Sequence, residues 1–368
     1  MTWSKAEVRQ RPNCENILIS GFFNEVLGIG KAAHLTAKTL EKLGFDVEKE
    51  DLRPFDKGLL SRGLDRFQTA NNHSIWIIQA NPNEAEIALY THDPHQWSKL
   101  YRIGYWVWES SIPPQIYIDL ADYFHEIWVP SHYVKEVLLN AFNHSNRPHN
   151  LQKLRVVPHP VAPSYEYTVH KNNEFNALYV FDPRSDFQRK NPEAVLKTWI
   201  AAFPEPDDDK KLIIKTLKLS NFYPAFQTLI KIADKRKDIV FIVEDFSEDE
   251  MNALLLQCQL YISLHRSEGF GLPLAEAMAR GLIVMATDNS GNNEFMTTEN
   301  SLLVRSTPIP ANRLYNGPKA LWREPDLDQA VKMLKIIAND QSLRLNLFSE
   351  AIKMAALFED QWKNILLK

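Results

Sequence analysis

The stretch that decides the fold is Ser267-Glu-Gly-Phe-Gly-Leu-Pro-Leu-Ala-Glu-Ala-Met-Ala-Arg-Gly281. The apolar residues Leu260–Leu264 before it predict a buried strand, and the glycines on either side of Phe270 predict a turn. From Pro273 the pattern predicts a helix, which Gly281 ends. A strand, a polar turn and a helix in this order are typical of the βα units of a parallel sheet.

The turn in this unit predicts a site for an anion. Ligands of parallel sheets bind beyond the carboxyl ends of the strands, where the free N–H groups and positive dipole end of the helix favour a diphosphate. Glu268 in the turn and Glu276 in the first helical turn should instead meet hydroxyl groups, as on a sugar and a ribose. Each feature also has a purely structural interpretation, because such a glutamate commonly complements the helix dipole and Gly-x-Gly commonly only turns the chain.

Composition limits the class of protein. A chain of 368 residues that is 45% hydrophobic is long enough for two globular domains. It has no apolar run of membrane-spanning length and starts with polar residues, which predicts a cytoplasmic protein. Cys14 and Cys258 are its only cysteines, so neither a disulfide framework nor a cysteine zinc site is expected. The net charge of −4 gives no electrostatic reason to bind nucleic acid, and leaves at most weak peripheral contact at the inner face of the cell membrane.

Strand and helix patterns alternate in both halves of the chain, which predicts an α/β fold with two parallel sheets. Strands are predicted at Asn16–Ser20, Ser74–Gln79, Arg102–Val107, Glu126–Val129 and Leu154–Val157, and then at Ala177–Phe181, Leu212–Lys215, Ile239–Val243, Leu260–Leu264 and Leu282–Ala286. Helix starts are marked by Asn191 as a cap before Pro192, and by Ser247 with Glu250 as a capping box.

Three prolines within Val157–Pro163 predict an interdomain linker. The domains are accordingly placed at residues 1–163 and 164–341. Residues 342–368 repeat apolar side chains with helical spacing and form the predicted C-terminal helix.

The quoted stretch resembles the Glu-x7-Glu motif of glycosyltransferase family four, and three further stretches extend the resemblance. VMATDNSGNNEFMTTENSLLV resembles the family's donor-sugar loop, RSDFQRKNPEAVLKTW its donor diphosphate segment, and REPDLDQAVKML the helix start that follows its nucleotide domain. Thinner similarity is visible in GFFNEVLGIGKAA, GYWVWESSIPP and EIWVPSHYVKEVL. The resemblance implies a GT-B fold: two Rossmann-like domains with a cleft between them, donor bound mainly by the second, and a final helix that crosses back to the first.

The same resemblance assigns roles to residues of the second half. Glu276 is expected to hold the donor ribose and Glu268 the transferred sugar, while Arg184 and Lys190 neutralise charge on the leaving diphosphate. Backbone groups around the turn would contact sugar and phosphate: Gly269, Phe270, Gly271 and Leu272. Asn191 departs from the family, since many relatives have glycine after the lysine.

The resemblance extends to four further residues. Glu294 matches a family acid near the donor but is also explained as a first-turn helix glutamate. In the first half, Gly28 and Gly30 resemble the glycine loop that meets the donor phosphates or the acceptor. Glu109 is expected at the carboxyl end of a strand, where it would face the cleft, although relatives place His or Asp in this region. A solvent-facing strand tip is the alternative for Glu109.

Two signals for a metal are set aside. Asp207-Asp208-Asp209 resembles an Asp-x-Asp metal motif, but its prolines and lysines predict a solvated turn. His92 and His95 are interpreted as part of a surface turn around Asp93. The sequence contains no Gly-x-Gly-x-x-Gly fingerprint, which argues against an oxidoreductase.

The resulting prediction is a retaining, metal-independent hexosyltransferase without a cofactor, which uses a nucleotide diphosphate sugar as its substrate. The acceptor would be a saccharide or lipid-linked saccharide, in bacterial surface polysaccharide or lipopolysaccharide synthesis. Two alternatives stay open: a nucleotide-sugar epimerase on the same fold, and a catalytically silent donor-binding subunit that scaffolds a partner.

Overall fold

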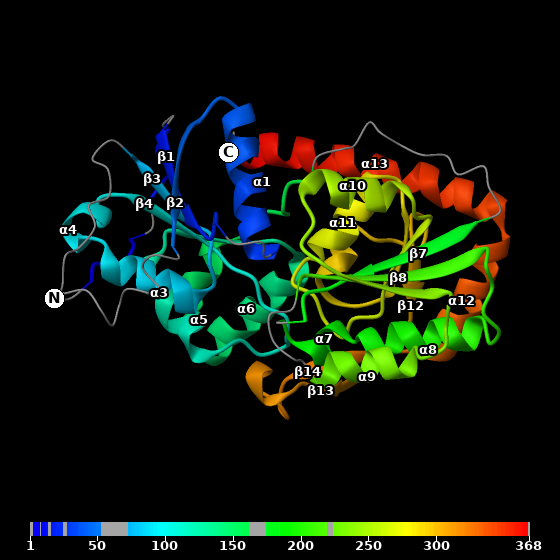
Figure 1. Cartoon of the computed structure of the whole chain (residues 1–368). Coiled ribbons are helices and arrows are strands. Elements are labelled where there is room, and N and C mark those ends of the chain that lie inside the picture. Colours follow the sequence, from blue (N-terminus) through cyan, green and yellow to red (C-terminus); the bar gives the residue numbers. More distant parts are fainter. Residues whose placement is uncertain are drawn as a thin grey trace. The chain divides into compact units, whose positions relative to one another are not determined.

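Figure 1 shows the chain as a computed structural model. The structure describes residues 3–366 except 8, 14–15, 25–27, 53–72, 162–173, 184 and 219–223, and only the backbone of 355–357, 359–360 and 365–366. The chain divides into two compact units, each of which is described by itself. The first is Met1–Pro160, Ala311–Ala320 and Phe358–Lys368, and the second is Val161–Pro310 and Leu321–Leu357.

The described part of the first unit is built on a six-stranded parallel sheet of order β2-β1-β3-β4-β5-β6. Its strands are β1 (Asn16–Gly21), β2 (Asp46–Asp51), β3 (Ile75–Ile78), β4 (Tyr101–Tyr105), β5 (Glu126–Val129) and β6 (Leu154–Val156). Its helices are α1 (Gly28–Lys42), α3 (Pro82–Thr91), α4 (Pro94–Trp97), α5 (Gln115–Leu120), η1 (Ala121–Tyr123), α6 (His132–His144) and η2 (Pro148–Lys153).

Alternation along the strands separates two apolar layers in this unit. On one face Ile75 and Ile77 of β3 pack with Ala37 and Leu40 of α1. On the other face Trp76 joins a second cluster that includes the helices α3, α5 and α6. With both faces covered, the carboxyl edge of the sheet is the place where polar side chains can gather.

The second unit repeats this plan with the order β12-β11-β10-β7-β8-β9, again all parallel. Its strands are β7 (Phe175–Val180), β8 (Lys210–Thr216), β9 (Ile239–Val243), β10 (Leu260–Ser263), β11 (Ile283–Thr287) and β12 (Leu302–Val304). Its helices are α7 (Phe187–Lys190), α8 (Pro192–Ala202), α9 (Pro224–Ile232), α10 (Glu248–Leu256), α11 (Leu272–Ala279), η3 (Ser290–Glu294) and α12 (Leu327–Asn339). In Figure 1, α8 and α9 lie on one face of this sheet and α10 and α11 on the other.

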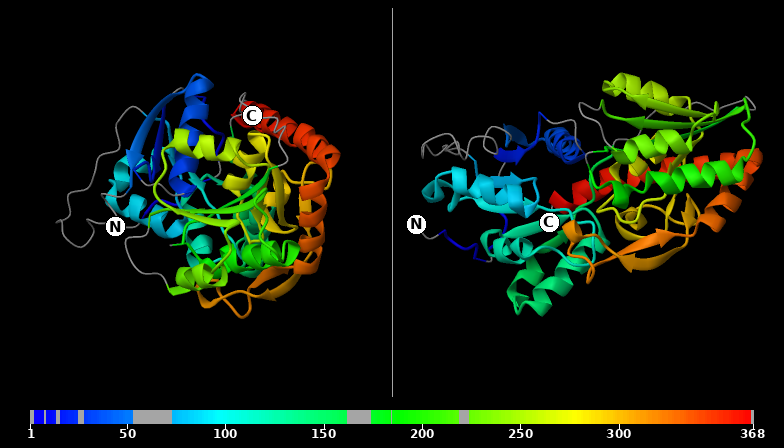
Figure 2. Two further views of the ribbon diagram at one scale, coloured as in Figure 1. Left: turned by 45° about the vertical axis from the view of Figure 1, so that its right-hand side comes forward. Right: turned by 60° about the horizontal axis from the view of Figure 1, so that its bottom comes forward.

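Two elements pass between the units along the chain. The hairpin of β13 (Ser306–Pro310) and β14 (Leu321–Pro325) belongs to the second unit, while its tip, which contains η4 (Arg313–Tyr315), belongs to the first. Helix α13 (Gln341–Leu366), red in Figure 2, starts in the second unit and ends in the first. There Trp362 is fully buried and its indole N–H donates to the carbonyl of Pro158 at 2.8 Å. No helix within the described ranges is both long and apolar enough to cross a bilayer.

The α/β prediction with two parallel sheets is confirmed, and its errors are local. Strand β2 was not predicted from the sequence. The predicted strand Arg102–Val107 ends at Tyr105, so the chain leaves the sheet earlier than expected. The capping box of Ser247 and Glu250 is present. Asn191 does precede α8, but its side chain makes no cap and donates instead to the carbonyl of Leu264 at 3.0 Å.

Candidate functional site

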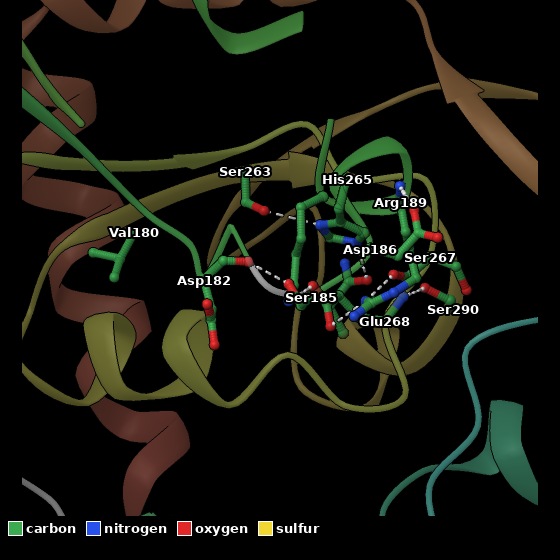
Figure 3. A network of polar contacts seen from close by, with 12 residues as sticks. Val180, Asp182, Ser185, Asp186, Arg189, Ser263, His265, Ser267, Glu268 and Ser290 are labelled. Carbon is green, nitrogen blue, oxygen red and sulfur yellow. Dashed lines mark hydrogen bonds and ion pairs between the residues drawn. The ribbon is translucent and has the colours of Figure 1, made fainter. Parts of the chain in front are cut away.

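A buried carboxylate lies at the carboxyl edge of the second sheet. Glu268 follows β10 in the turn before α11, as predicted, and only 7% of its surface is exposed. Its two oxygens accept from two different cations: Lys190 Nζ lies 2.5 Å from Oε1, and Arg189 Nη1 lies 3.1 Å from Oε2. Figure 3 shows Arg189, Ser267 and Glu268 gathered in this cluster.

Local structure explains why both cations reach Glu268. They end the short helix α7, which Asp186 caps by accepting from the N–H of Arg189 at 2.8 Å. Helix α7 follows β7, and β7 pairs with β10, so the two connections leave the same edge of the sheet. Arg189 also donates to the carbonyl of Ser267 at 2.9 Å, which fixes its guanidinium beside the turn.

The electrostatics of this cluster favour the charged form of the acid. Burial by itself raises the pKa of Glu268, but the charges of Lys190 and Arg189 outweigh it and lower the pKa to about 2. The three groups therefore carry a net positive charge at neutral pH. A cluster of this sign at a sheet edge suits an anionic ligand.

A loop from the neighbouring strand β11 completes the wall of the site. Ser290 Oγ accepts from the N–H of Glu268 at 2.8 Å, and the N–H of Gly291 donates to the carbonyl of Glu268 at 2.8 Å. A Cβ on Gly291 would lie 2.1 Å from the carbonyl oxygen of Gly269, so only glycine allows these backbones to approach so closely.

A buried histidine, His265, supports the turn that carries Glu268. His265 is inaccessible to solvent, and burial lowers its pKa to about 4, so the ring is neutral at neutral pH. Its Nε2 lies 3.0 Å from Asn292 Oδ1 and its Nδ1 lies 3.1 Å from Ser263 Oγ. A neutral ring satisfies both contacts when Nε2 donates and Nδ1 accepts.

The start of α11 provides backbone N–H groups next to this cluster. Gly271 precedes the helix in a left-handed conformation, with φ of +89°. Phe270 is buried and its ring lies 5.1 Å from that of Phe295, which holds the turn against the β11 loop.

Glu276 was predicted in the first helical turn, but it is the fifth residue of α11 and lies in the second turn. Its carboxylate therefore does not complement the helix start, and the dipole interpretation is wrong.

The remaining predicted residues of this unit have mixed outcomes. Leu272 is the first residue of α11 and is buried. Glu294 ends η3, so its interpretation as a first-turn helix glutamate is wrong. Arg184 lies outside the described residues. The structure thus brings Glu268, Lys190 and the Gly269–Leu272 turn together.

Three predicted residues belong to the first unit. Helix α1 begins at Gly28, which has open space around its Cα, and Gly30 is buried in the first turn. Glu109 lies four residues beyond the end of β4 rather than at its tip, and it is half-buried rather than solvent-facing. Burial, together with the charges of Glu109 and Glu84, raises the pKa of Tyr117.

The loop that carries Glu109 is held on several sides. The N–H of Val107 donates to Asn81 Oδ1 at 2.9 Å, and Tyr117 donates to the carbonyl of Val107 at 2.6 Å. Trp108 Nε1 donates to the carbonyl of Ile112 at 2.9 Å. These hydrogen bonds fix the backbone on either side of Glu109, so the loop that carries Glu109 has a defined conformation.

The acidic triplet and the histidine pair form no metal cluster in the described part of the chain. Asp207 and Asp208 pair with Lys210 and Lys237 in an exposed turn, as predicted. His92 is different from its prediction: it is fully buried, with Nε2 2.8 Å from Glu50 Oε1, so the surface-turn interpretation is wrong for this residue.

Sequence reasoning missed Arg189, Ser290 and His265. Arg189 adjoins Lys190, and a pair of cations before a helix start could have signalled a shared partner. Ser290 and His265 act through contacts between loops that are distant in sequence, for which single-sequence patterns give no signal.

The free cysteine in the described part, Cys258, is buried away from this cluster on the chain segment after α10.

Comparison with known proteins identifies this part of the chain. Residues 188–310 match the family model described as glycosyl transferases group 1, so the resemblance noted in the sequence is confirmed for the segment that carries the cluster. A putative glycosyltransferase of Acidianus filamentous virus 2 (isolate Italy/Pozzuoli) is 26% identical over 127 residues. That match covers 34% of this chain and 34% of the viral protein, about a third of each.

Solved structures extend the similarity to the whole fold. The HepE protein of Anabaena, in complex with UDP and glucose, superposes with a TM-score of 0.69 at 12% identity, covering 96% of this chain and 99% of its own. Sucrose-phosphate synthase from Thermosynechococcus elongatus gives 0.68 at 12% identity, with 96% and 97% covered. TarM of S. aureus gives 0.58 at 12% identity, and 80% of this chain matches 55% of TarM. At such identities these matches establish the fold, which is GT-B as predicted.

We predict that Gly291→Ala destabilises the second unit by about 2 kcal/mol or more, because the new Cβ forces two backbones apart. Urea unfolding measures the loss. Gly28→Ala is the matched control, since its Cβ meets nothing within 4 Å. Equal losses in the two variants would contradict the close-approach argument.

We also predict that the Glu268 cluster contributes stability that acid removes. The folded-state pKa of about 2 lies below the usual value near 4.3, so the contribution is full above the unfolded pKa and is lost as pH falls toward the folded one. The stability advantage of the wild type over Glu268→Gln should therefore shrink between about pH 5 and pH 3. A gap that stays constant over this range in thermal unfolding would disprove the assignment.

Proposed function

Because residues 188–310 carry the group 1 glycosyl transferase segment, we propose that the chain transfers a sugar from a nucleoside diphosphate sugar to an acceptor hydroxyl. The observation that supports it most is the buried Glu268 shared by Arg189 and Lys190 beside the start of α11. The whole activity is proposed rather than carried over, since the matched segment spans a third of the viral relative.

In this proposal the cluster changes partners when the donor binds. Lys190 turns from Glu268 to the diphosphate, and the N–H groups at the start of α11 bind the same phosphates. Arg189 stays buried on the carboxylate and keeps Glu268 ionised, so that Glu268 accepts hydrogen bonds from hydroxyl groups of the transferred sugar. Glu276 binds the donor ribose, as the family resemblance implies, and Arg184 adds a second cation for the phosphates.

Fixed cations directed at the leaving diphosphate stabilise the charge that develops as the glycosidic bond breaks. The same cations make a metal ion unnecessary for that task, and we therefore propose metal-independent transfer. Retention of the anomeric configuration, a hexosyl donor and a role in bacterial surface polysaccharide synthesis are finer proposals that rest on the family resemblance alone.

We propose that the donor base is uracil. The Anabaena HepE structures and the pneumococcal O-GlcNAc transferase GtfA contain UDP. A panel of nucleoside diphosphate sugars tested by thermal shift would identify the donor, because a ligand at a hundred times its Kd adds about 2.7 kcal/mol of stability. Product analysis with and without acceptor then separates transfer from epimerisation, and repeating it in EDTA tests the metal-independent proposal.

We predict that Lys190→Ala lowers kcat by roughly a hundredfold or more, equivalent to about 2.7 kcal/mol on the barrier, because the leaving diphosphate loses its counter-charge. Steady-state kinetics with the identified donor provides the measurement. Lys231→Ala is the matched control, because Lys231 is an exposed lysine on α9. Near-normal turnover and donor affinity in a folded Lys190→Ala protein would remove Lys190 from the proposed mechanism.

We further propose that Glu109 contacts the acceptor hydroxyl or the reacting sugar. The supporting observation is its position on a fixed loop beyond the carboxyl end of β4, where parallel sheets place their ligands. A carboxylate there can orient a hydroxyl or offset positive charge on the sugar ring.

Glu109→Gln keeps the shape of the side chain and removes its charge. We predict a fall in kcat of roughly a hundredfold at saturating donor, about 2.7 kcal/mol, with donor affinity retained. Asp119→Asn, on the exposed side of α5, serves as a control for removing an acid from the same unit. An unchanged rate in Glu109→Gln would restrict this residue to a structural role.

A further inference from the structure

The tip of the β13–β14 hairpin, residues 311–320, is a tightly built loop. The carbonyl of Asn312 accepts from the N–H groups of Tyr315 at 3.1 Å and Gly317 at 2.9 Å, and Asn312 Oδ1 accepts from Leu314 at 3.1 Å. A Cβ on Gly317 would lie 1.9 Å from the carbonyl oxygen of Ala311. These contacts fix the backbone, so the side chains of the tip are presented in defined directions.

Contacts within the first unit hold this tip in place. The ring of Tyr315 lies 5.1 Å from that of Trp108, and Ser110 Oγ donates to the carbonyl of Tyr315 at 3.1 Å. Asn316 Nδ2 donates to the carbonyl of Ile112 at 3.3 Å, which brings Ile112 beside the tip. In Figure 2 the tip is the orange loop at the end of the hairpin.

Two apolar side chains of this region face solvent. Leu314 is 77% exposed, the highest value among the large apolar side chains that the structure describes, and Ile112 is 39% exposed. A single exposed leucine is common on protein surfaces. A leucine held outward on a fixed loop, with a second apolar side chain beside it, needs a further explanation.

The charges of the tip are all of one sign. Arg313 and Lys319 are exposed, residues 311–320 contain no acid, and neither cation forms an ion pair with any residue that the structure describes. The chain as a whole has a net charge of −4, so this local excess of positive charge runs against the overall composition. Exposed apolar side chains flanked by cations match the interface of an anionic lipid bilayer.

We propose that Ile112, Arg313, Leu314 and Lys319 form a docking tip for an anionic membrane surface. Leu314 and Ile112 enter the boundary between headgroups and acyl chains, while the two cations bind lipid phosphates. A protein partner fits less well, because a narrow loop offers far less than the roughly 800 Å² per partner of a stable protein interface. The proposal does not depend on the transfer chemistry, because none of these four residues belongs to the Glu268 cluster.

Vesicle co-sedimentation of the full chain tests the docking tip. Wild-type protein is expected to bind vesicles that contain phosphatidylglycerol and to bind pure phosphatidylcholine more weakly, with salt reducing the difference. Arg313→Ser with Lys319→Ser should lower the partition coefficient by roughly 25-fold, about fivefold for each cation. Leu314→Ser should also lower it, whereas Leu345→Ser, at a leucine of α13 that is 50% exposed, should not.

Thermal unfolding and nucleotide affinity, measured on the same preparations, show that the variants are folded and separate this proposal from that of sugar transfer. Three outcomes would overturn the docking tip: no binding of the wild type to anionic vesicles, unchanged binding of Leu314→Ser, or equal losses in Leu314→Ser and Leu345→Ser. Self-association that Leu314→Ser abolishes, seen by light scattering without lipid, would assign the tip to a second copy of the chain instead.

Discussion

The shared ion pair of Glu268 with Arg189 and Lys190 is the interaction on which the second unit's edge depends. A carboxylate buried without cations would protonate, and two cations buried without a carboxylate would repel each other. Together they allow polar groups from the connections after β7 and β10 to meet in a site that is largely shielded from solvent. The β11 loop then closes on the same turn through Ser290 and Gly291.

The parallel topology explains why several polar side chains lie at the carboxyl edge of the sheet. Connections after neighbouring strands leave a parallel sheet on the same side, so residues 79 positions apart in sequence become neighbours without any local signal. Arg189 and Glu268 illustrate this relation, since α7 follows β7 while Glu268 follows β10. The donor chemistry that we propose uses this edge, and the first unit repeats the plan with Glu109 beyond β4.

Most of the fold could be predicted from the sequence because apolar runs such as those of β3 and β10 are buried on both faces. Strand β2 could not, because Asp46–Asp51 carries five charged side chains and lies at the edge of its sheet, where polar residues are tolerated. Glu268 and Lys190 were accessible through a motif, whereas the partner Arg189 depends on the tertiary structure. Asn191 was placed correctly, but its left-handed conformation and its bond to Leu264 depend on how α7 and α8 meet.

The crossing of Gly291 over Gly269 also constrains how this protein can be re-engineered. At that crossing the turn after β10 and the loop after β11 touch through backbone atoms, with no side chain between them to absorb a change. Neither loop can be exchanged for that of a structurally similar protein without distorting the other. A graft intended to alter the sugar preference that we propose would have to transplant both loops as one cassette, and libraries that randomise one of them should keep Gly291 fixed.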